Sequence, residues 1–236
     1  MNTLENTFIK ITVKSFGAEL CSVKSKQTNI EYIWQANESV WARHAPNLFP
    51  IVGKLHNNEF VFKNKTYQLS QHGFARDNEF ECVEQTETKI VFQLAHSEKT
   101  LLHYPFQFKF LVTYQLTDNN VVATYTIRNT DTKDLYFSVG AHPAFNCPLE
   151  SSEAFEDYEL EFNLNANPII NALNNGLISN STSELVLSNN ILPINKKIFE
   201  KDALVFLNAQ INEVSLVSNK SKHGVKLISE NWPIFV

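Results

Sequence analysis

Alternation of hydrophobic and polar residues is the dominant pattern along this 236-residue chain. The clearest run lies at 106–116, where apolar and polar positions alternate, and a β-branched run at 121–128 follows the polar residues 118–120. Strict alternation is typical of a half-buried β-strand, and turn residues between two such runs indicate a hairpin. We therefore predict an antiparallel pair here, with residues 135–140 returning as the third strand of a meander.

Similar patterns recur through the rest of the chain, and they predict a protein made almost entirely of strands. No window keeps a helical period for more than two turns, and no internal repeat is present. We expect a long irregular excursion at 165–192 and one short helical turn at 194–200. This content predicts an all-β fold, a large antiparallel β-sandwich that forms a single domain over residues 1–236. The further predicted strands are residues 8–13, 89–94, 158–164, 203–206, 213–217 and 224–228.

Composition and charge narrow the possible partners. Hydrophobic residues make up 43% of the chain, which is enough for a full core, and the formal net charge is -5. Without a basic stripe the chain is a poor match for nucleic acid, and without a run of about 18 apolar residues or a secretory pattern we expect no membrane partner. We expect a cytoplasmic protein, monomer or homodimer, that binds a small molecule. Three widely spaced cysteines without a C-x-x-C pattern predict reduced and mostly buried thiols.

Two short motifs carry the candidate chemistry. They read QHGFAR at residues 71–76 and GAHPAFN at residues 140–146. The proline after His142 disfavours helical backbone at that histidine, and the glycine after His72 lets a ligand or another strand come close. An imidazole that titrates near neutral pH is a natural donor or acceptor for a proton moving to a hydroxyl or ether oxygen. The motifs therefore predict a proton-transfer site at His72 and His142, with Arg76 as a planar donor beside it.

Other chemistries fit the sequence less well. The two histidines lack the H-E-x-x-H and H-x-H spacings of zinc ligands, and a third ligand would have to be chosen arbitrarily. No G-x-S-x-G motif marks a serine nucleophile, and six glycines leave no Gly-rich phosphate loop. The residues thus favour acid and base chemistry over metal or nucleophilic catalysis.

Several segments, taken in order with the two histidine motifs, resemble one known family. The chain is similar to the aldose 1-epimerase (galactose mutarotase) family, in particular its LacX-like branch, from about residue 16 to the end. The resemblance implies a galactose mutarotase-like supersandwich of antiparallel sheets that interconverts the α and β anomers of a free hexose, with no metal or organic cofactor. The segments that carry it are Phe16–Leu20, Glu31–Trp34, Ala45–Leu55, Tyr104–Phe108 and Phe199–Leu204.

The resemblance also implies roles for individual residues. His142 matches the general acid that protonates the sugar ring oxygen, and His72 matches the histidine that holds or polarises the same region. Arg76 and Asp202 match positions that bind sugar hydroxyls. Lys54 stands where relatives commonly have arginine, so we expect a weaker and less directional contact there.

The general base of the family is the one role that finds no match. The resemblance places it on a glutamate in a Cys-x-Glu-Pro-Trp stretch near the C-terminus, and the residues around Glu230 do not fit that pattern. We therefore expect a truncated chain that lacks C-terminal strands. A shortened relative acting as a noncatalytic carbohydrate-binding or sensing module is the alternative.

A second enzymatic alternative is an epimerase acting on a hexose 6-phosphate. Relatives of that kind also carry an H-G-x-x-R motif. Arg76, together with Arg43 or Lys54, offers the cationic groups that a phosphate requires.

Overall fold

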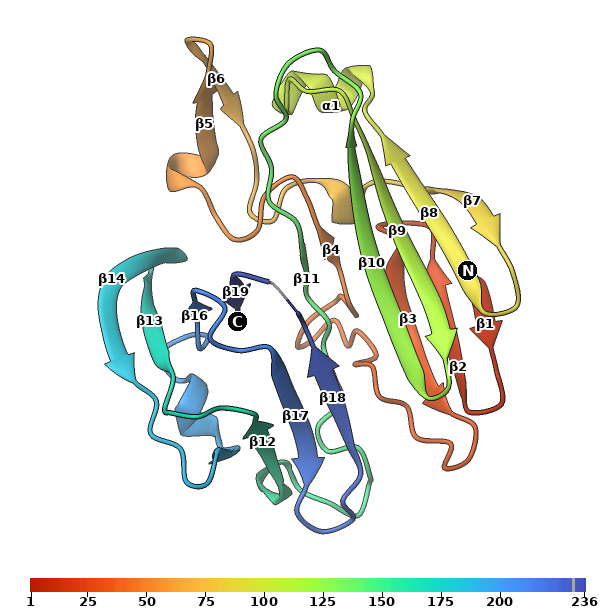
Figure 1. The fold of residues 1–236 in the computed structure, drawn as a ribbon, viewed down its shortest axis with the longest axis vertical. Helices are drawn as coiled ribbons and strands as arrows, with labels where there is room; N and C mark the ends of the chain where they lie inside the picture. The colour runs from red at the N-terminus through yellow and green to blue at the C-terminus, as the bar shows by residue number, and fades with distance from the viewer. Residues whose placement is uncertain (231) are drawn as a thin grey trace. The chain divides into compact units, whose positions relative to one another are not determined.

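The computed structural model describes residues 1–230 and 232–236. They form two compact units, Met1–Asn146 and Cys147–Val236, whose strands are labelled in Figure 1. Every strand pair that joins named strands is antiparallel, so the predicted all-β antiparallel class is confirmed. The prediction of a single domain over residues 1–236 stays a prediction.

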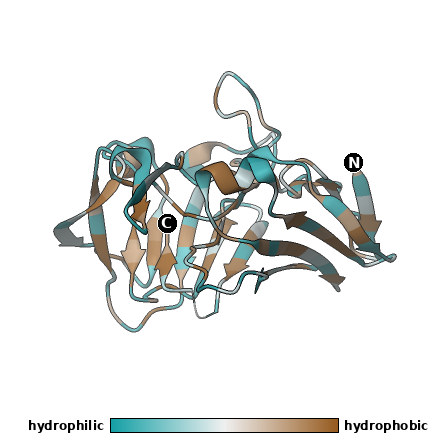
Figure 2. Cartoon of the chain, turned by 90° about the horizontal axis from the view of Figure 1, so that it is seen from above, coloured by the Kyte–Doolittle hydropathy of each residue, from teal (hydrophilic) through white to brown (hydrophobic). Residues whose placement is uncertain are grey.

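The first unit contains a three-stranded sheet, in the order β1-β2-β3, and a four-stranded sheet, in the order β10-β9-β8-β7. Both sheets contribute side chains to one buried hydrophobic cluster, so they form a sandwich around a shared core. Figure 2 shows strands banded with hydrophobic and hydrophilic residues, as this arrangement requires. The strands are β1 (Asn2–Glu5), β2 (Ile9–Lys14), β3 (Glu19–Ser25), β7 (Glu81–Gln85), β8 (Lys89–Ala95), β9 (Phe108–Thr117) and β10 (Asn120–Asn129).

Strand β9 shows how the sequence pattern produces this core. Its alternate residues Phe108, Phe110 and Val112 are fully buried, while the residues between them are exposed or half-buried. Each such side chain contributes about 1.5–3 kcal/mol by leaving water. The strand turns directly into β10, with Thr117 opposite Asn120. The hairpin predicted from the alternating residues is therefore confirmed.

Smaller elements complete the first unit. A two-stranded ladder joins β4 to β11, and a hairpin joins β5 to β6. The α-helix begins after Ser97, whose hydroxyl accepts a hydrogen bond from the backbone N–H of Thr100 in a capping box. These elements are β4 (Asn47–Leu48), β5 (Glu59–Phe62), β6 (Lys65–Gln68), β11 (Gly140–Ala141), α1 (Glu98–His103) and the 3₁₀ helices η1 (His56–Asn58) and η2 (Ala75–Asp77).

The predicted third strand of the meander, residues 135–140, is wrong. The sheet ends at β10, and only Gly140 and Ala141 form a strand, which pairs with β4 instead. The ring of Phe137 lies 5.9 Å from that of buried Phe49, and the backbone N–H of Ser138 donates to Pro50. Contact with the core and with the chain after β4 thus holds this segment, although its residues favour a strand.

The second unit contains a four-stranded sheet in the order β15-β12-β17-β18, with two smaller pairs, β13-β14 and β16-β19. Its own buried cluster consists of Phe162, Phe206, Ile211 and Val214. The elements are β12 (Tyr158–Phe162), β13 (Ile169–Asn174), β14 (Leu177–Glu184), β15 (Ile191–Pro193), β16 (Phe206–Leu207), β17 (Glu213–Ser218), β18 (Gly224–Ile228), β19 (Ile234–Phe235), η3 (Phe155–Asp157) and η4 (Lys196–Phe199).

The predicted irregular excursion at 165–192 is also wrong, because β13 and β14 form a hairpin within it. Its turn consists of Asn175 and Gly176, both with positive φ, at 52° and 78°. An Asn-Gly pair between two strands is the strongest short-range signal for such a hairpin. The short helical turn predicted at 194–200 is confirmed by η4, whereas the strand predicted at 203–206 starts only at Phe206.

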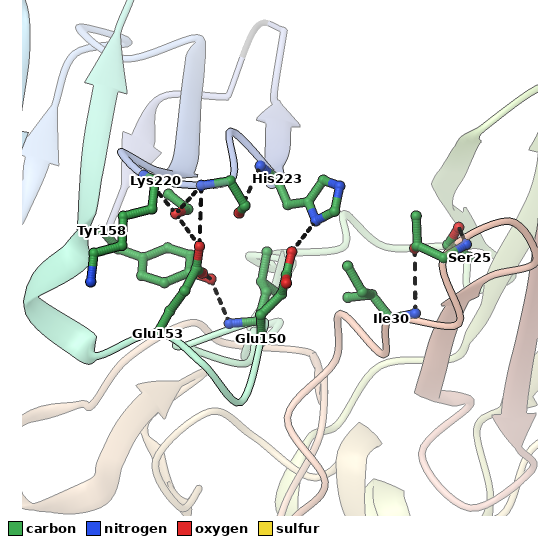
Figure 3. Close-up of polar contacts among 11 residues, drawn as sticks. Ser25, Ile30, Glu150, Glu153, Tyr158, Lys220 and His223 are labelled. Carbon is green, nitrogen blue, oxygen red and sulfur yellow. Dashed lines mark hydrogen bonds and ion pairs between the residues drawn. The ribbon is translucent and has the colours of Figure 1, made fainter.

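A polar network in the second unit ties the loop before β12 to the turn after β17 (Figure 3). The carboxylate of Glu153 accepts hydrogen bonds from Ser218 Oγ, at 2.6 Å, and from the Tyr158 hydroxyl. These bonds lower the pKa of Glu153 to about 2, and the bond from Ser218 makes the largest contribution. His223 Nδ1 lies 2.5 Å from Glu150 Oε1 in the same network. Because these residues are hydrogen-bonded to one another, the network holds the turn after β17 against the loop before β12.

The three cysteines are free, and their burial differs from the prediction. Cys21 is buried and Cys147 is half-buried, but Cys82 is exposed. Cys82 lies on β7, an edge strand whose five residues are all exposed. The sequence pattern around Cys82 does not reveal this edge position.

Candidate functional site

The chain around β4 carries both predicted histidine motifs. The backbone N–H of His142 donates to Pro46, just before β4, at 3.1 Å. Just after β4, Phe49 accepts from the backbone N–H of Phe74, and Gly53 accepts from that of His72 at 2.8 Å. Both motifs are therefore attached by backbone hydrogen bonds to one short stretch of the first unit.

The motif at 71–76 requires glycine at its third position. Gly73 has φ of 69°, and a Cβ on it would lie 2.3 Å from the backbone oxygen of Phe49. His72 itself has φ of 67°, which is uncommon for a residue other than glycine. Close approach of two backbones thus fixes where the His72 ring can go.

The two imidazoles lie close together. The ring centroids of His72 and His142 are 5.7 Å apart, with the planes nearly perpendicular at 81°. The Trp41 ring lies 5.2 Å from the His142 ring, at an interplanar angle of 36°. Trp41 is tied in turn to Trp34, whose indole N–H donates to the Trp41 backbone oxygen at 2.8 Å. The His142 ring therefore lies next to the rings of Trp41 and His72.

The environment of His72 disfavours a positive charge on its ring. The backbone N–H of Gly53 donates to His72 Nδ1 at 3.0 Å. Burial, followed by the charges of Arg76, His142 and Arg43, lowers the pKa of His72 to about 4. The ring is therefore neutral at pH 7.

His142 is more open to solvent than His72. Desolvation of its ring lowers the pKa below the ordinary value, and the charge of Arg76 acts in the same direction. A hydrogen bond to the backbone of His142 itself raises the pKa and opposes that shift. His142 therefore has more access to water than His72, and the pKa of each ring lies below its ordinary value.

Arg76 lies in η2, beside Arg43 and Asp77. Its Nη2 donates to the backbone oxygen of Gln71 at 2.9 Å, and its Nε is buried with no hydrogen-bond partner among the described residues. Arg43 and Arg76 share one carboxylate, with Asp77 oxygens at 2.7 Å from Arg43 and 3.7 Å from Arg76. Burial, and then the charge of Arg43, lowers the pKa of Arg76. Two guanidinium groups thus meet one carboxylate beside the histidines.

The other predicted site residues are placed differently. Lys54 follows Gly53, is exposed, and has no ion pair among the residues that the structure describes. Asp202 lies in the second unit, is exposed, and accepts a hydrogen bond from the backbone N–H of Ala203 at 2.8 Å. The structure therefore brings His72, His142 and Arg76 together, while the sugar contacts of Lys54 and Asp202 stay predictions.

Sequence reasoning missed two contributors to this site. In the sequence Trp41 is only one of many aromatic residues, and nothing local shows that it contacts His142. Gly53 lies in the motif Ala45–Leu55, yet its amide is recognised as a partner of His72 only in three dimensions.

The described residues contain neither a metal-ligand cluster nor a membrane-spanning helix. Among them, no group of three or more His, Cys, Asp or Glu side chains is arranged to hold a metal ion. None of their helices combines the length and the apolar character needed to cross a membrane.

Comparison with known proteins defines the class to which this fold and site belong. The family model for aldose 1-epimerase matches residues 1–234, so the chain belongs to the aldose 1-epimerase family. The plasmid-encoded protein LacX of Lactococcus lactis subsp. lactis is 32% identical over 98% of this chain and 80% of its own length. The family resemblance predicted from the motifs is confirmed.

Solved structures agree with this assignment. The galactose mutarotase related enzyme from Lactobacillus acidophilus superposes with a TM-score of 0.94 at 37% identity, over 99% of this chain and 78% of that one. A galactose mutarotase-like protein from Lactobacillus casei ATCC 334 gives a TM-score of 0.90 at 33% identity, over 99% of this chain and 81% of that one. The galactose mutarotase-like fold is thereby established for this chain.

Proposed function

We propose that this protein interconverts the α and β anomers of a free hexose by acid/base opening and closing of the sugar ring. The observation that carries the proposal is the pair of imidazoles held 5.7 Å apart by backbone contacts to one stretch of chain, with Arg76 beside them. Two groups at this spacing can reach neighbouring oxygens of a single sugar. The family name and the mutarotase-related relatives support the same reaction.

The chemistry assigns a separate task to each group. His142, when protonated, gives its proton to the ring oxygen as the bond from that oxygen to C1 breaks, while the anomeric hydroxyl loses its proton to a base. Rotation about C1–C2 in the open aldehyde followed by closure, with the proton returning to His142, produces the other anomer. Acid catalysis of this kind contributes typically about 10²–10⁴-fold. His72 and Arg76 hold the sugar oxygens in place.

The charges near the histidines set a limit on which group is the base. The charged groups that shift the pKa of His72 are all cationic, namely Arg76, His142 and Arg43. The carboxylate that forms ion pairs with these arginines is that of Asp77, whose oxygens lie 2.7 Å from Arg43 and 3.7 Å from Arg76. We therefore assign the acid half of the reaction to this group of residues and leave the base unassigned.

Polarimetry on freshly dissolved α-galactose and α-glucose tests the proposal. We expect the protein to accelerate the change in optical rotation, and His142→Asn to remove that acceleration. His103→Asn serves as the matched control, because this exposed histidine lies at the end of α1 and has no role in the proposed chemistry. If neither sugar is accelerated but sugar binding is measurable by calorimetry, this chain is a carbohydrate-binding protein and the enzymatic proposal is wrong.

A hexose 6-phosphate is the second candidate substrate, and the arginine pair favours it. Arg43 and Arg76 compete for one carboxylate, and Arg76 Nε is buried without a hydrogen-bond partner among the described residues. A phosphate dianion would offer this pair the acceptors that Asp77 alone does not supply. The two substrates therefore differ in their dependence on Arg43.

Arg43→Gln separates the two substrates. If the phosphate is the natural substrate, we expect KM for glucose 6-phosphate to rise about 10-fold or more, as for the loss of one hydrogen bond between charged groups, with little change for galactose. Arg128→Gln removes the remaining arginine of the chain, on β10, and is the matched control. Equal behaviour of Arg43→Gln and Arg128→Gln with glucose 6-phosphate would contradict this second candidate.

A further inference from the structure

His72 and Gly53 exchange two hydrogen bonds, and in each of them a backbone N–H is the donor. The backbone N–H of His72 donates to the Gly53 oxygen at 2.8 Å, and the backbone N–H of Gly53 donates to His72 Nδ1 at 3.0 Å. A backbone N–H can only donate, so Nδ1 must present a lone pair. In a neutral imidazole whose Nδ1 accepts, the single proton is on Nε2.

We propose that the Gly53 amide locks His72 in its neutral Nε2–H form, so that His72 acts as a fixed hydrogen-bond donor to a sugar oxygen and His142 alone of the two transfers a proton. This inference rests on the proposed function and adds to it. It makes Gly53 a positioning residue, acting through the ring of His72.

The backbone that carries the His72 ring is held by close contacts and hydrogen bonds. His72 and Gly73 both have positive φ, and the Gly73 backbone packs directly against that of Phe49. The backbone N–H groups of Phe74 and Ala75 both donate to the Phe49 oxygen, at 3.0 and 3.1 Å. Protonation of Nδ1 would place a ring N–H against the Gly53 N–H and leave that backbone donor without its acceptor.

The groups around the ring act in the same direction. Arg76 from η2, Arg43 from the loop before β4 and His142 after β11 all disfavour a positive charge on His72. The nearby carboxylate of Asp77 forms ion pairs with both arginines. Among the described residues, the charged groups that shift the pKa of His72 include no carboxylate.

The second ring nitrogen faces an adjustable partner. His72 Nε2 lies 3.4 Å from the side-chain amide nitrogen of Gln71, which is exposed. Rotation of that amide about its last bond presents its oxygen as an acceptor, whereas the Gly53 backbone amide has no such freedom. The fixed donor therefore decides the tautomer, and the Nε2 proton remains available to a ligand.

Nitrogen-15 NMR of uniformly histidine-labelled protein tests the lock without requiring catalysis. We expect the His72 resonances, assigned by their loss in His72→Gln, to show an unprotonated Nδ1 and a protonated Nε2 from pH 8 down to pH 5. N-acetylhistidine in the same tube, which titrates near pH 6.5, is the reference. A protonated Nδ1 in the neutral ring, or a titration of His72 that follows the reference, would overturn the proposal.

Kinetics of two variants test the role of the donor. Glutamine can place an amide N–H where Nε2 stands, while the shorter asparagine places its amide near Nδ1. We expect His72→Gln to keep kcat/KM within about 10-fold of wild type with an unshifted pH profile, and His72→Asn to lose about 100-fold, as for a lost donor to a developing oxyanion. A shifted pH profile in His72→Gln, or equal losses in both variants, would mean that His72 moves a proton itself. If the wild-type protein does not accelerate anomer exchange, the proposed function is wrong. The NMR experiment still tests whether the Gly53 amide holds His72 in its Nε2–H form, because it does not depend on catalysis.

Discussion

His72 and His142 are both histidines, and both are hydrogen-bonded through their backbones to residues that flank β4, but their side chains lie in different environments. His72 accepts a hydrogen bond from a backbone amide and is half-buried among cations, whereas His142 is more exposed and packs against Trp41. Burial and hydrogen-bond direction decide which protonation state an imidazole holds. This difference is the basis of our proposal that one motif supplies a fixed donor and the other a group that gains and loses a proton.

The largest expected effect tests this division directly. We predict that His142→Asn lowers kcat for anomer exchange by about 10²–10⁴-fold, because a proton-transfer group is lost, whereas His72→Gln costs about 10-fold or less. Polarimetric rates on the same hexose measure both. Losses of equal size would show that the two rings share one role.

The backbone that sets the His72 ring provides the next prediction. Gly73→Ala is expected to lower the free energy of unfolding by about 2–4 kcal/mol, because positive φ disfavours alanine and its Cβ would collide with Phe49. Gly53→Ala is the matched control, since it also has positive φ, at 77°, but a Cβ added there would meet nothing within 4 Å. Its expected cost is about 1 kcal/mol. Urea unfolding measures both values, and equal costs would mean that the contact with Phe49 imposes no constraint.

Acid should destabilise the protein through His72 in a defined pH window. Its pKa is about 4 in the folded protein and near 6.5 in the unfolded chain, so between these values the unfolded chain binds more protons. The contribution is fully present above pH 6.5 and falls by about 1.4 kcal/mol per pH unit as the pH decreases towards 4. Urea unfolding of wild type and His72→Gln at pH 8 and pH 4.5 should therefore show a difference that changes by about 2.5 kcal/mol. A pH-independent difference would contradict a neutral His72.

The smallest expected effect concerns the aromatic neighbour of His142. An aromatic pair contributes about 0.5–1.5 kcal/mol beyond its buried area, which corresponds to roughly 2–10-fold in rate. We predict a loss of this size in kcat for Trp41→Leu and a smaller one for Trp41→Phe, which keeps a ring against His142. A Trp41→Leu variant with unchanged kcat would show that His142 is oriented without this contact.

The accuracy of the sequence predictions differs between the four-stranded sheet of the first unit and the segments around it. The β9–β10 hairpin is predictable because one face of β9 is buried and alternate β10 residues such as Tyr125 and Ile127 pack half-buried against the same core, which imposes a period of two. Residues 135–140 favour a strand equally well, yet they pack against Phe49 and hydrogen-bond beyond β4. The Asn175-Gly176 turn is a local signal too, but the Asn- and Ser-rich residues around it favour an irregular loop and obscure the hairpin.

The sequence by itself determined that this is an all-β protein of the aldose 1-epimerase family, with two histidines held out of ordinary helical backbone. Those properties depend on local patterns: alternation, a proline after one histidine and a glycine after the other. Only the tertiary structure decided that Trp41 contacts His142 and that the Gly53 amide donates to His72. Those contacts join residues separated by 101 and 19 positions, and the protonation state of each ring depends on the groups that packing places beside it.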